Sequence, residues 1–314
     1  MPVRSKWQSL PTEQINPSTL AIDKLSPADI VEGMLNEDRK MLAAVQREKE
    51  RIAVGVEIIT QALRKNGRII FVGAGTSGRL GVLESAEMPP TFGTDPDLVQ
   101  AIMAGGKNAV YKAREGVEDN HEEGARSINR LRPTRKDVVI GVSASGMTQF
   151  VRGALTRARR AGSKIIFVTC DPRTELQTFV DLTIAPAVGP EVIAGSTRLK
   201  AGTATKMVLN MLTTAAMVRI GKTYGNLMVD VQMGSEKLKD RARRIIVIVT
   251  GLDYDAADAL LRKAHWNVKA AIVMQKTSLT YPKAVSRLRK SHDFVRDAIG
   301  EDVEARLKEL LKVG

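Results

Sequence analysis

The pattern of apolar positions changes near Asn66-Gly67. Before that point, apolar side chains recur three or four positions apart through residues 30–63, which is the spacing of an amphipathic helix. Ser26-Pro27 is a typical helix start, with serine as the cap and proline at the first helical position. We expect Asn36 to cap a second helix, which Asn66-Gly67 ends.

After Gly67, short apolar runs alternate with stretches that favour helices. Such alternation is typical of an α/β fold in which helices cover both faces of a parallel sheet. The predicted strands are residues 68–72, 98–103, 137–142, 164–169 and, more weakly, 182–185. Helices are expected at residues 80–88, 147–161 and 202–219, and several short helices after residue 236.

In such a sheet, ligands bind beyond the carboxyl ends of the strands. The first predicted strand runs into Gly73-Ala74-Gly75-Thr76-Ser77-Gly78-Arg79. A dinucleotide fold needs an acid after the second strand, and that strand ends in Ala104-Gly105-Gly106; a nucleotide P-loop needs lysine where Arg79 stands. We therefore predict that Gly75, Thr76, Ser77 and Gly78 bind one phosphate monoester at a helix start. A tight turn without a ligand is the alternative.

A second hydroxyl-rich loop follows the third predicted strand, as Ser143-Ala144-Ser145-Gly146-Met147-Thr148. It also opens a helix, so ordinary capping by Ser145 or Thr148 is the alternative if the loop is taken alone. Two such loops at the carboxyl ends of parallel strands enclose a phosphate from two sides. The candidate binding residues here are Ser143, Ser145, Gly146 and Thr148.

Carboxylates stand near both loops. Glu84 and Glu87 share one face of a helix that Pro89-Pro90 is expected to end, and Glu118 follows the second strand in a charged segment. A solvated surface is the usual role of such residues, so spacing alone assigns them no chemistry.

Composition narrows the classes of function. The chain carries a formal net charge of +13, but basic and acidic side chains nearly balance in residues 1–60, and no aromatic residues interleave with the basic ones. We therefore expect no nucleic-acid partner. One cysteine and three histidines exclude an intrachain disulfide and disfavour a zinc cluster. No apolar run reaches the length of a membrane helix, and we expect a cytoplasmic protein.

The glycine loop, residues 84–93 and the second hydroxyl loop resemble the sugar isomerase (SIS) domain of N-acetylmuramic acid 6-phosphate etherases. The segment from Gly189 to Lys206, with the sequence GPEVIAGSTRLKAGTATK, is similar to a signature that these etherases share with the glucokinase regulatory protein. Thr12-Glu13-Gln14-Ile15-Asn16-Pro17 and residues 225–230 also fit the etherase pattern. The resemblance covers about residues 12–298 and implies a SIS-type, flavodoxin-like sheet.

The resemblance implies cleavage of the lactyl ether at C3 of an N-acetyl sugar 6-phosphate, giving N-acetylglucosamine 6-phosphate and D-lactate. A base removes the C2 proton and an acid protonates the lactate oxygen, so two carboxyl groups suffice, without metal or redox cofactor. The family's two glutamates correspond to Glu87 and Glu118. Met88 stands where cysteine is common and Glu84 where aspartate is common. Within the signature, we include among the candidate binding residues Glu191, Ser196, Arg198 and Lys200; structural ion pairs of the basic residues are an equal alternative.

One geometric difficulty follows. On a straight helix, Ser77 and Glu87 would lie about 15 Å apart, too far for the two ends of one sugar phosphate. Either that helix is broken or Glu87 acts across a dimer interface. We expect a homodimer with shared active sites.

The sequence divides into an N-terminal helical region (residues 1–58), the SIS domain (59–225) and a C-terminal helical region (226–314). The last resembles a small ubiquitin-associated-like bundle, for which packing and dimer support are the expected roles. A non-catalytic sugar-phosphate-binding regulatory protein is the alternative function, although such regulators are longer and contain two SIS domains. A SIS-type transcription regulator would need a basic N-terminal DNA-binding unit.

Overall fold

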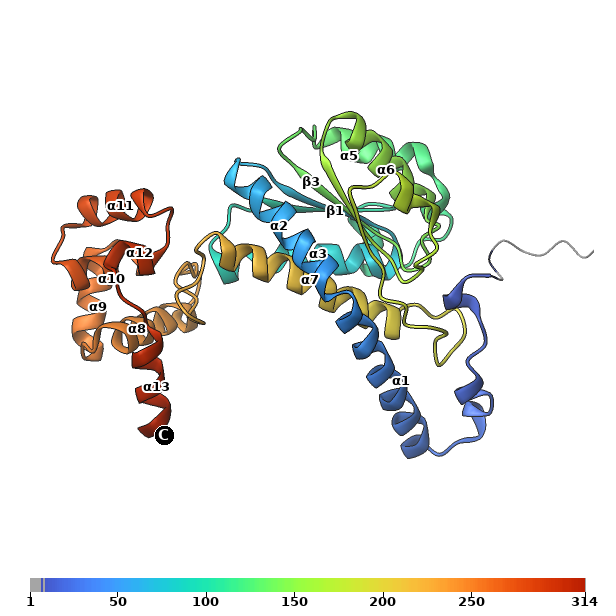
Figure 1. Ribbon diagram of the computed structural model, residues 1–314, viewed down its shortest axis with the longest axis horizontal. Coiled ribbons are helices and arrows are strands. Elements are labelled where there is room, and N and C mark those ends of the chain that lie inside the picture. The colour runs from blue at the N-terminus through green and yellow to red at the C-terminus, as the bar shows by residue number, and fades with distance from the viewer. Residues whose placement is uncertain (1–6, 8, 314) are drawn as a thin grey trace, which may run out of the picture. The chain divides into compact units, whose positions relative to one another are not determined.

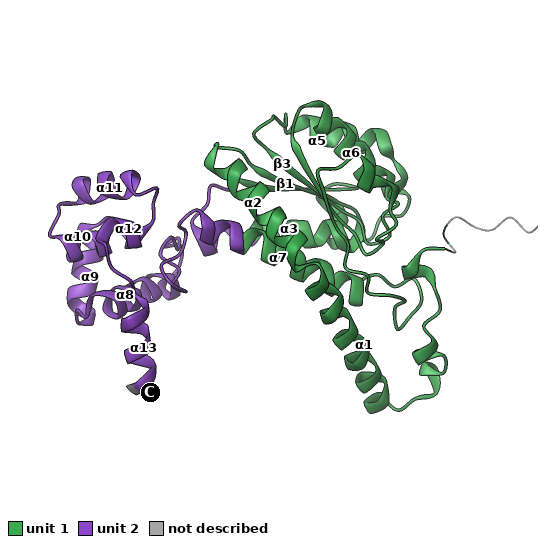
Figure 2. Cartoon of the chain, viewed as in Figure 1, with its two compact units in different colours: residues 1–86, 97–214 green, residues 87–96, 215–314 purple. Residues whose placement is uncertain are grey.

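A computed structural model describes residue 7 and residues 9–313. The chain forms two compact units (Figure 2). The first contains residues 1–86 and 97–214, and the second contains residues 87–96 and 215–314. The three-part division at residues 58 and 225 stays a prediction.

The first unit is built on a five-stranded parallel sheet in the order β2-β1-β3-β4-β5. The α/β class and all five strands are thus confirmed. Every residue of the neighbouring interior strands β1 and β3 is buried, as expected for a sheet covered on both faces. The strands are β1 (Ile69–Gly73), β2 (Val99–Met103), β3 (Val138–Val142), β4 (Lys164–Val168) and β5 (Leu182–Ile184).

Helices cover both faces of this sheet. Figure 1 shows α5 and α6 over one face and α2, α3 and α7 over the other. Their bounds are α2 (Lys49–Arg64), α3 (Gly75–Phe92), α5 (His121–Arg130), α6 (Gln149–Arg160) and α7 (Lys200–Arg219). Short elements in the connecting loops are α4 (Asn108–Tyr111), η4 (Val117–Asp119) and η5 (Glu175–Thr178).

Two glycines let α5 and α6 pack very closely. A Cβ on Gly124 of α5 would lie 1.9 Å from the carbonyl oxygen of Phe150, and one on Gly153 of α6 would lie 1.9 Å from that of His121. Each glycine therefore admits the backbone of the other helix. This contact fixes the start of α6, and so the loop that precedes it, against α5.

Three 3₁₀ turns, η1 (Pro11–Glu13), η2 (Pro17–Thr19) and η3 (Ile22–Lys24), lead into α1 (Pro27–Arg47). The expected start of α1 is confirmed, because Ser26 Oγ accepts a hydrogen bond from the backbone N–H of Asp29. The prediction that Asn36 caps a second helix is wrong, since α1 runs through it. The break comes at Glu48, whose carboxylate accepts a hydrogen bond from Ala185 N at 3.0 Å and holds this junction near β5.

The prediction that Pro89-Pro90 ends a helix is also wrong. Helix α3 continues through both prolines to Phe92 and stops at Gly93, which has a φ of +59°. Each proline removes one backbone donor, but its φ suits a helix. Met88 and Phe92, four residues apart, are both buried, and their packing holds the last turn in place. A Cβ on Gly93 would lie 2.2 Å from the carbonyl oxygen of Asp230, so this turn packs against the 225–230 motif.

Beyond the end of α3, the second unit consists mainly of short helices, as the sequence predicts. Its apolar core is formed mainly by aliphatic side chains such as Ile246, Leu261 and Ile272. Its helices are α8 (Glu236–Thr250), α9 (Tyr254–Lys263), α10 (Val268–Thr277), α11 (Tyr281–Lys290), α12 (Val295–Ile299) and α13 (Glu304–Val313). Within the described residues, no helix combines the length and the apolar character that a membrane span requires.

Candidate functional site

A cavity of about 400 Å³ lies at the carboxyl ends of β1 and β3 in the first unit. It brings together most of the predicted phosphate ligands and one of the two predicted catalytic glutamates. Its lining residues are Trp7, Glu13, Ala74, Gly75, Thr76, Ser77, Glu118, Ser143, Ala144, Ser145, Thr148, Gly195 and Thr197.

The first loop turns directly from β1 into α3. Gly75 has a φ of +53°, and no heavy atom lies within 4 Å of where its Cβ would stand, so it faces open space. Gly78 has a different role: a Cβ there would lie 2.8 Å from the carbonyl oxygen of Gly73. Gly78 therefore lets the first turn of α3 pack onto the strand end, while Thr76 and Ser77 line the cavity at the helix N-terminus. A helix N-terminus with hydroxyl groups suits an anion.

The second loop presents hydroxyl groups that are not used for capping. Thr148 is the N-cap residue of α6, but its side chain makes no capping hydrogen bond. Instead, Thr148 Oγ1 lies 2.8 Å from Ser143 Oγ, and Ser145 Oγ accepts a long hydrogen bond from Met147 N. Gly146 does not line the cavity; its φ of +73° and its close approach to the Thr174 side chain shape the turn.

Glu118 lies in the same cavity as the two loops. Its 3₁₀ turn, η4, follows Gly116, which adopts a φ of +73°. The neighbouring Val117 packs against the apolar core of the sheet, which anchors the segment while Glu118 stays exposed. Among the described lining residues there is no lysine or arginine, so hydroxyls and backbone N–H groups are what the cavity offers an anion.

Two signature residues have structural roles instead. The carboxylate of Glu191 is buried and accepts hydrogen bonds from the backbone N–H groups of Lys200 and Ala201, each at 2.9 Å, which caps α7. Burial raises the pKa of Glu191 in spite of these hydrogen bonds. Lys200 Nζ lies 2.5 Å from a carboxylate oxygen of Glu37, and both side chains are almost fully buried. Neither residue lines the cavity.

The remaining predicted residues also lie outside the cavity lining. Ser196 is half-buried in the turn before α7, and Arg198 is exposed. Glu87 is exposed on α3. Glu84, by contrast, is buried and accepts hydrogen bonds from Asn210 Nδ2 and from the hydroxyl of Thr213, so it ties α3 to α7.

Six lining residues were not among the sequence candidates: Ala74 and Ala144 within the two predicted loops, and Trp7, Glu13, Gly195 and Thr197 outside them. Glu13 and Gly195 belong to two segments that carry the family resemblance, residues 12–17 and the signature from Gly189 to Lys206. That both segments reach one cavity depends on tertiary structure, which neither segment reveals alone.

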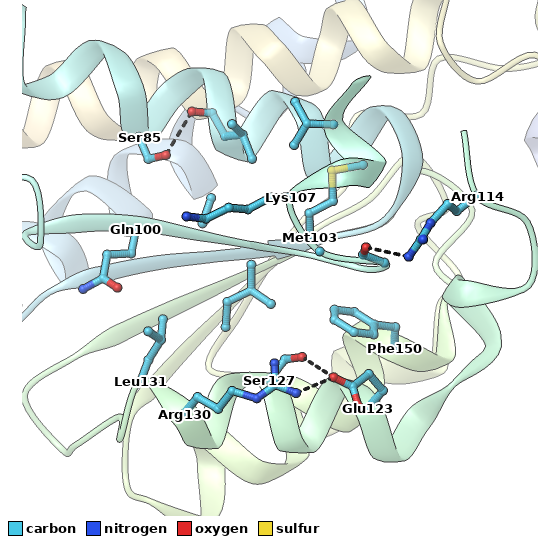
Figure 3. A pocket seen from close by; sticks show the side chains of 16 residues that line it. Ser85, Gln100, Met103, Lys107, Arg114, Glu123, Ser127, Arg130, Leu131 and Phe150 are labelled. Atoms are coloured by element: carbon cyan, nitrogen blue, oxygen red, sulfur yellow. Dashed lines mark hydrogen bonds and ion pairs between the residues drawn. The ribbon is translucent and has the colours of Figure 1, made fainter. Parts of the chain in front are cut away.

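A larger cavity, of about 770 Å³, lies along the edge strand β2 and contains none of the predicted site residues. Figure 3 shows Ser85 and Lys107 on one side of this strand and Glu123 and Arg130 on the other. Glu123 is neutralised by Arg130 at 2.6 Å, and the hydrogen bonds from Arg130 and Arg126 hold the pKa of its carboxyl below the usual range.

Relatives with curated names match almost the whole chain. The N-acetylmuramic acid 6-phosphate etherase of Salinibacter ruber is 51% identical over 296 residues, which cover 94% of this chain and 95% of that protein. The etherase of Clostridioides difficile is 47% identical and covers 93% and 96%. The chain belongs to the N-acetylmuramic acid 6-phosphate etherases.

Family models agree with this etherase assignment. The model of the glucokinase regulatory protein N-terminal SIS domain matches residues 51–159, and that of the SIS domain matches residues 117–215. Both matches fall largely on the sheet that carries the cavity, and the predicted SIS resemblance is confirmed. Among solved structures, a phosphoheptose isomerase from Francisella tularensis is similar, with a TM-score of 0.49, 17% identity and coverage of 61% of this chain and 98% of that one.

Proposed function

We propose that the chain is a carbon–oxygen lyase that cleaves the D-lactyl ether of N-acetylmuramic acid 6-phosphate. One observation carries the proposal: Glu118 shares a cavity with both hydroxyl loops, in a chain that is 51% identical to a named etherase. The substrate is a sugar phosphate, and the two loops offer the hydroxyl and backbone N–H donors that bind a phosphate monoester.

The proposed reaction is an elimination followed by addition. In the open-chain sugar, the C1 aldehyde acidifies the C2 proton, and a carboxylate removes it as the C3–oxygen bond breaks. A carboxylic acid gives its proton to the departing lactate oxygen. Water then adds across the C2–C3 double bond, with its hydroxyl at C3 and a proton at C2, which gives N-acetylglucosamine 6-phosphate and D-lactate. Glu118 and Glu87 are the two proposed proton carriers.

In this proposal, the phosphate end of the substrate is held where helices α3 and α6 begin. Thr76 and Ser77 at the start of α3 and Ser145 and Thr148 before α6 would donate to the phosphate oxygens. The N-terminal partial charges of both helices add to this attraction. A site of this kind holds an anion without the lysine that a nucleotide P-loop uses.

We further propose a homodimer in which Glu87 completes the partner's site. Helix α3 is unbroken from Gly75 to Phe92, so Ser77 and Glu87 lie about 15 Å apart along its axis. Helix α1 supports dimer formation, because a stripe of its apolar side chains is exposed: Val31 (55%), Leu35 (49%) and Leu42 (53%). Apolar stripes of this kind mark interaction surfaces.

D-Lactate release from N-acetylmuramic acid 6-phosphate is the direct test. The protein should release stoichiometric lactate, and Glu118→Gln should lower kcat by at least about 100-fold, the contribution of a general acid or base. Glu115→Gln is the matched control, because Glu115 is exposed in the same segment but does not line the cavity. A protein that binds the substrate without releasing lactate would support the non-catalytic regulatory protein instead.

Mixing two inactive variants tests the shared site. If Glu87 acts across the interface, a dimer of one Glu87→Gln and one Glu118→Gln chain contains one intact site and one doubly altered site. An equal mixture that exchanges subunits should then recover about a quarter of the wild-type activity. If both glutamates serve the site of their own chain, the mixture will stay inactive. A cytoplasmic location likewise remains a proposal, based on the lone cysteine and on the metabolic substrate.

A further inference from the structure

The N-terminal segment of residues 9–25, here called the N-terminal arm, is fastened to the signature segment that precedes α7. Gly195 N donates a hydrogen bond to the carbonyl oxygen of Thr12 at 3.1 Å. Asn16 Nδ2 donates to the carbonyl oxygen of Pro190 at 3.2 Å, and Thr19 Oγ1 donates to that of Val192 at 3.0 Å. Thr12 and Asn16 are buried, so the arm is a fixed part of the first unit.

This attachment places the carboxylate of Glu13 at the cavity. Glu13 and Gly195 both line it, and a Cβ on Gly195 would lie 3.0 Å from Oε2 of Glu13. Gly195 also has a φ of +75°. Glycine therefore suits this position for two reasons: it adopts the left-handed backbone conformation without strain, and it has no Cβ to crowd the Glu13 carboxylate. Among the described residues, the Glu13 carboxylate has neither a hydrogen-bond donor nor an ion-pair partner. Its acceptor oxygens are therefore available to a ligand.

We propose that Glu13 is a substrate-binding residue whose carboxylate accepts hydrogen bonds from the hydroxyl groups of the sugar. This inference rests on the proposed etherase function. An ionised carboxylate is an acceptor only, and it repels the phosphate and the lactyl carboxylate at the two ends of the substrate. The groups that it can bind are the donors between those ends. The N-terminal arm thus makes the cavity selective for a sugar phosphate over a bare phosphate ion.

The test compares sugar binding with phosphate binding in Glu13→Gln and Glu13→Ala. The KM for lactate release and the Kd for the product, N-acetylglucosamine 6-phosphate, should rise about 10- to 100-fold in the alanine variant, the range for a lost hydrogen bond to a charged group. The glutamine variant keeps one acceptor oxygen and should lose less. Because this contact is made in both the ground state and the transition state, kcat should stay within about threefold. Inorganic phosphate should bind no more weakly to either variant, so its inhibition constant should stay the same or fall, because both variants lose a negative charge that repels the anion.

Gln14→Ala is the matched control, since Gln14 is exposed on the same arm and lies outside the cavity lining; its constants and those of the wild type should agree. Unchanged thermal midpoints would show that all variants fold. Wild-type KM and Kd values in both Glu13 variants, or a loss confined to kcat, would overturn the inference. Lactate release by the wild type and its loss in Glu118→Gln test the proposed function separately. The Kd for the product decides the role of Glu13 even if no lactate is released.

Discussion

Replacing Lys200 with methionine separates a structural role of this signature residue from a substrate-binding one. Lys200 Nζ lies 2.5 Å from Oε2 of Glu37, and the two side chains are only 2% and 4% exposed. Methionine fills a similar volume but leaves the Glu37 carboxylate buried without its main partner. Lys40 Nζ, 2.5 Å from the other oxygen, remains, but this lysine is 61% exposed and therefore partly screened.

The expected loss of stability in Lys200→Met follows from this geometry. Removing one member of a buried ion pair costs about 3–5 kcal/mol, because an uncompensated charge stays in the interior. The remaining contact with Lys40 places Lys200→Met at the low end, about 3 kcal/mol. The matched variant Lys40→Met removes an exposed partner and should cost less than about 1 kcal/mol. The double variant Glu37→Leu/Lys200→Met should recover most of the loss, because no buried charge is then unpaired.

Urea unfolding followed by circular dichroism gives the stability of each variant, and lactate release gives its activity. At a temperature where Lys200→Met is folded, its kcat/KM should lie within about threefold of the wild type, since Lys200 does not line the cavity. Loss of activity with an unchanged urea midpoint would refute this reasoning. It would return Lys200 to the set of substrate ligands.

Three further predictions follow from the same structure. Burial opposes ionisation of Glu37, but hydrogen bonds from Lys200 and Lys40 outweigh it and lower its pKa from 4.5 to about 2; the urea midpoint should therefore fall as the pH drops from 4.5 toward 2, and less so in Lys200→Met. Burial, with the charge of Glu191, raises the pKa of Cys170 to about 12. Iodoacetamide should therefore label this thiol only after unfolding, as measured by mass spectrometry. Gly153→Ala should lower the free energy of unfolding by about 1–3 kcal/mol in the same urea assay, whereas Gly33→Ala, with nothing within 4 Å, should not.

The sheet could be predicted because its signals are local. Each buried strand is a short apolar run bounded by polar or glycine residues, and the run of residues 68–72 differs from β1 by one residue at each end. The two hydroxyl loops could be placed together because parallel strands end at one edge of the sheet. Glu118 follows β2, beside β1 in the strand order, so its presence in the cavity agrees with the same rule.

The roles of the signature residues could not be predicted, because they depend on partners distant in the sequence. Lys200 pairs with Glu37, which lies 163 residues earlier in the chain. Glu13 lies at the cavity because the N-terminal arm is hydrogen-bonded to a segment more than 170 residues away. Nothing local distinguishes a lysine that binds a substrate from one that pairs inside the fold. The same holds for Glu191, which caps α7 from nine residues before Lys200, farther than the two or three residues over which a local cap acts.

The argument for a shared site rests on the stretch of α3 that precedes its two prolines. They stand directly after Glu87 and Met88, and they deprive the carbonyl groups of Ser85 and Ala86 of their helical donors. A break at this point would still leave residues 77–87 helical, so it could not bring Glu87 back toward Ser77. The helix continues past the prolines, where Met88 and Phe92 are buried. In the proposed dimer, α3 would serve two sites, its own through the first turn and the partner's through Glu87.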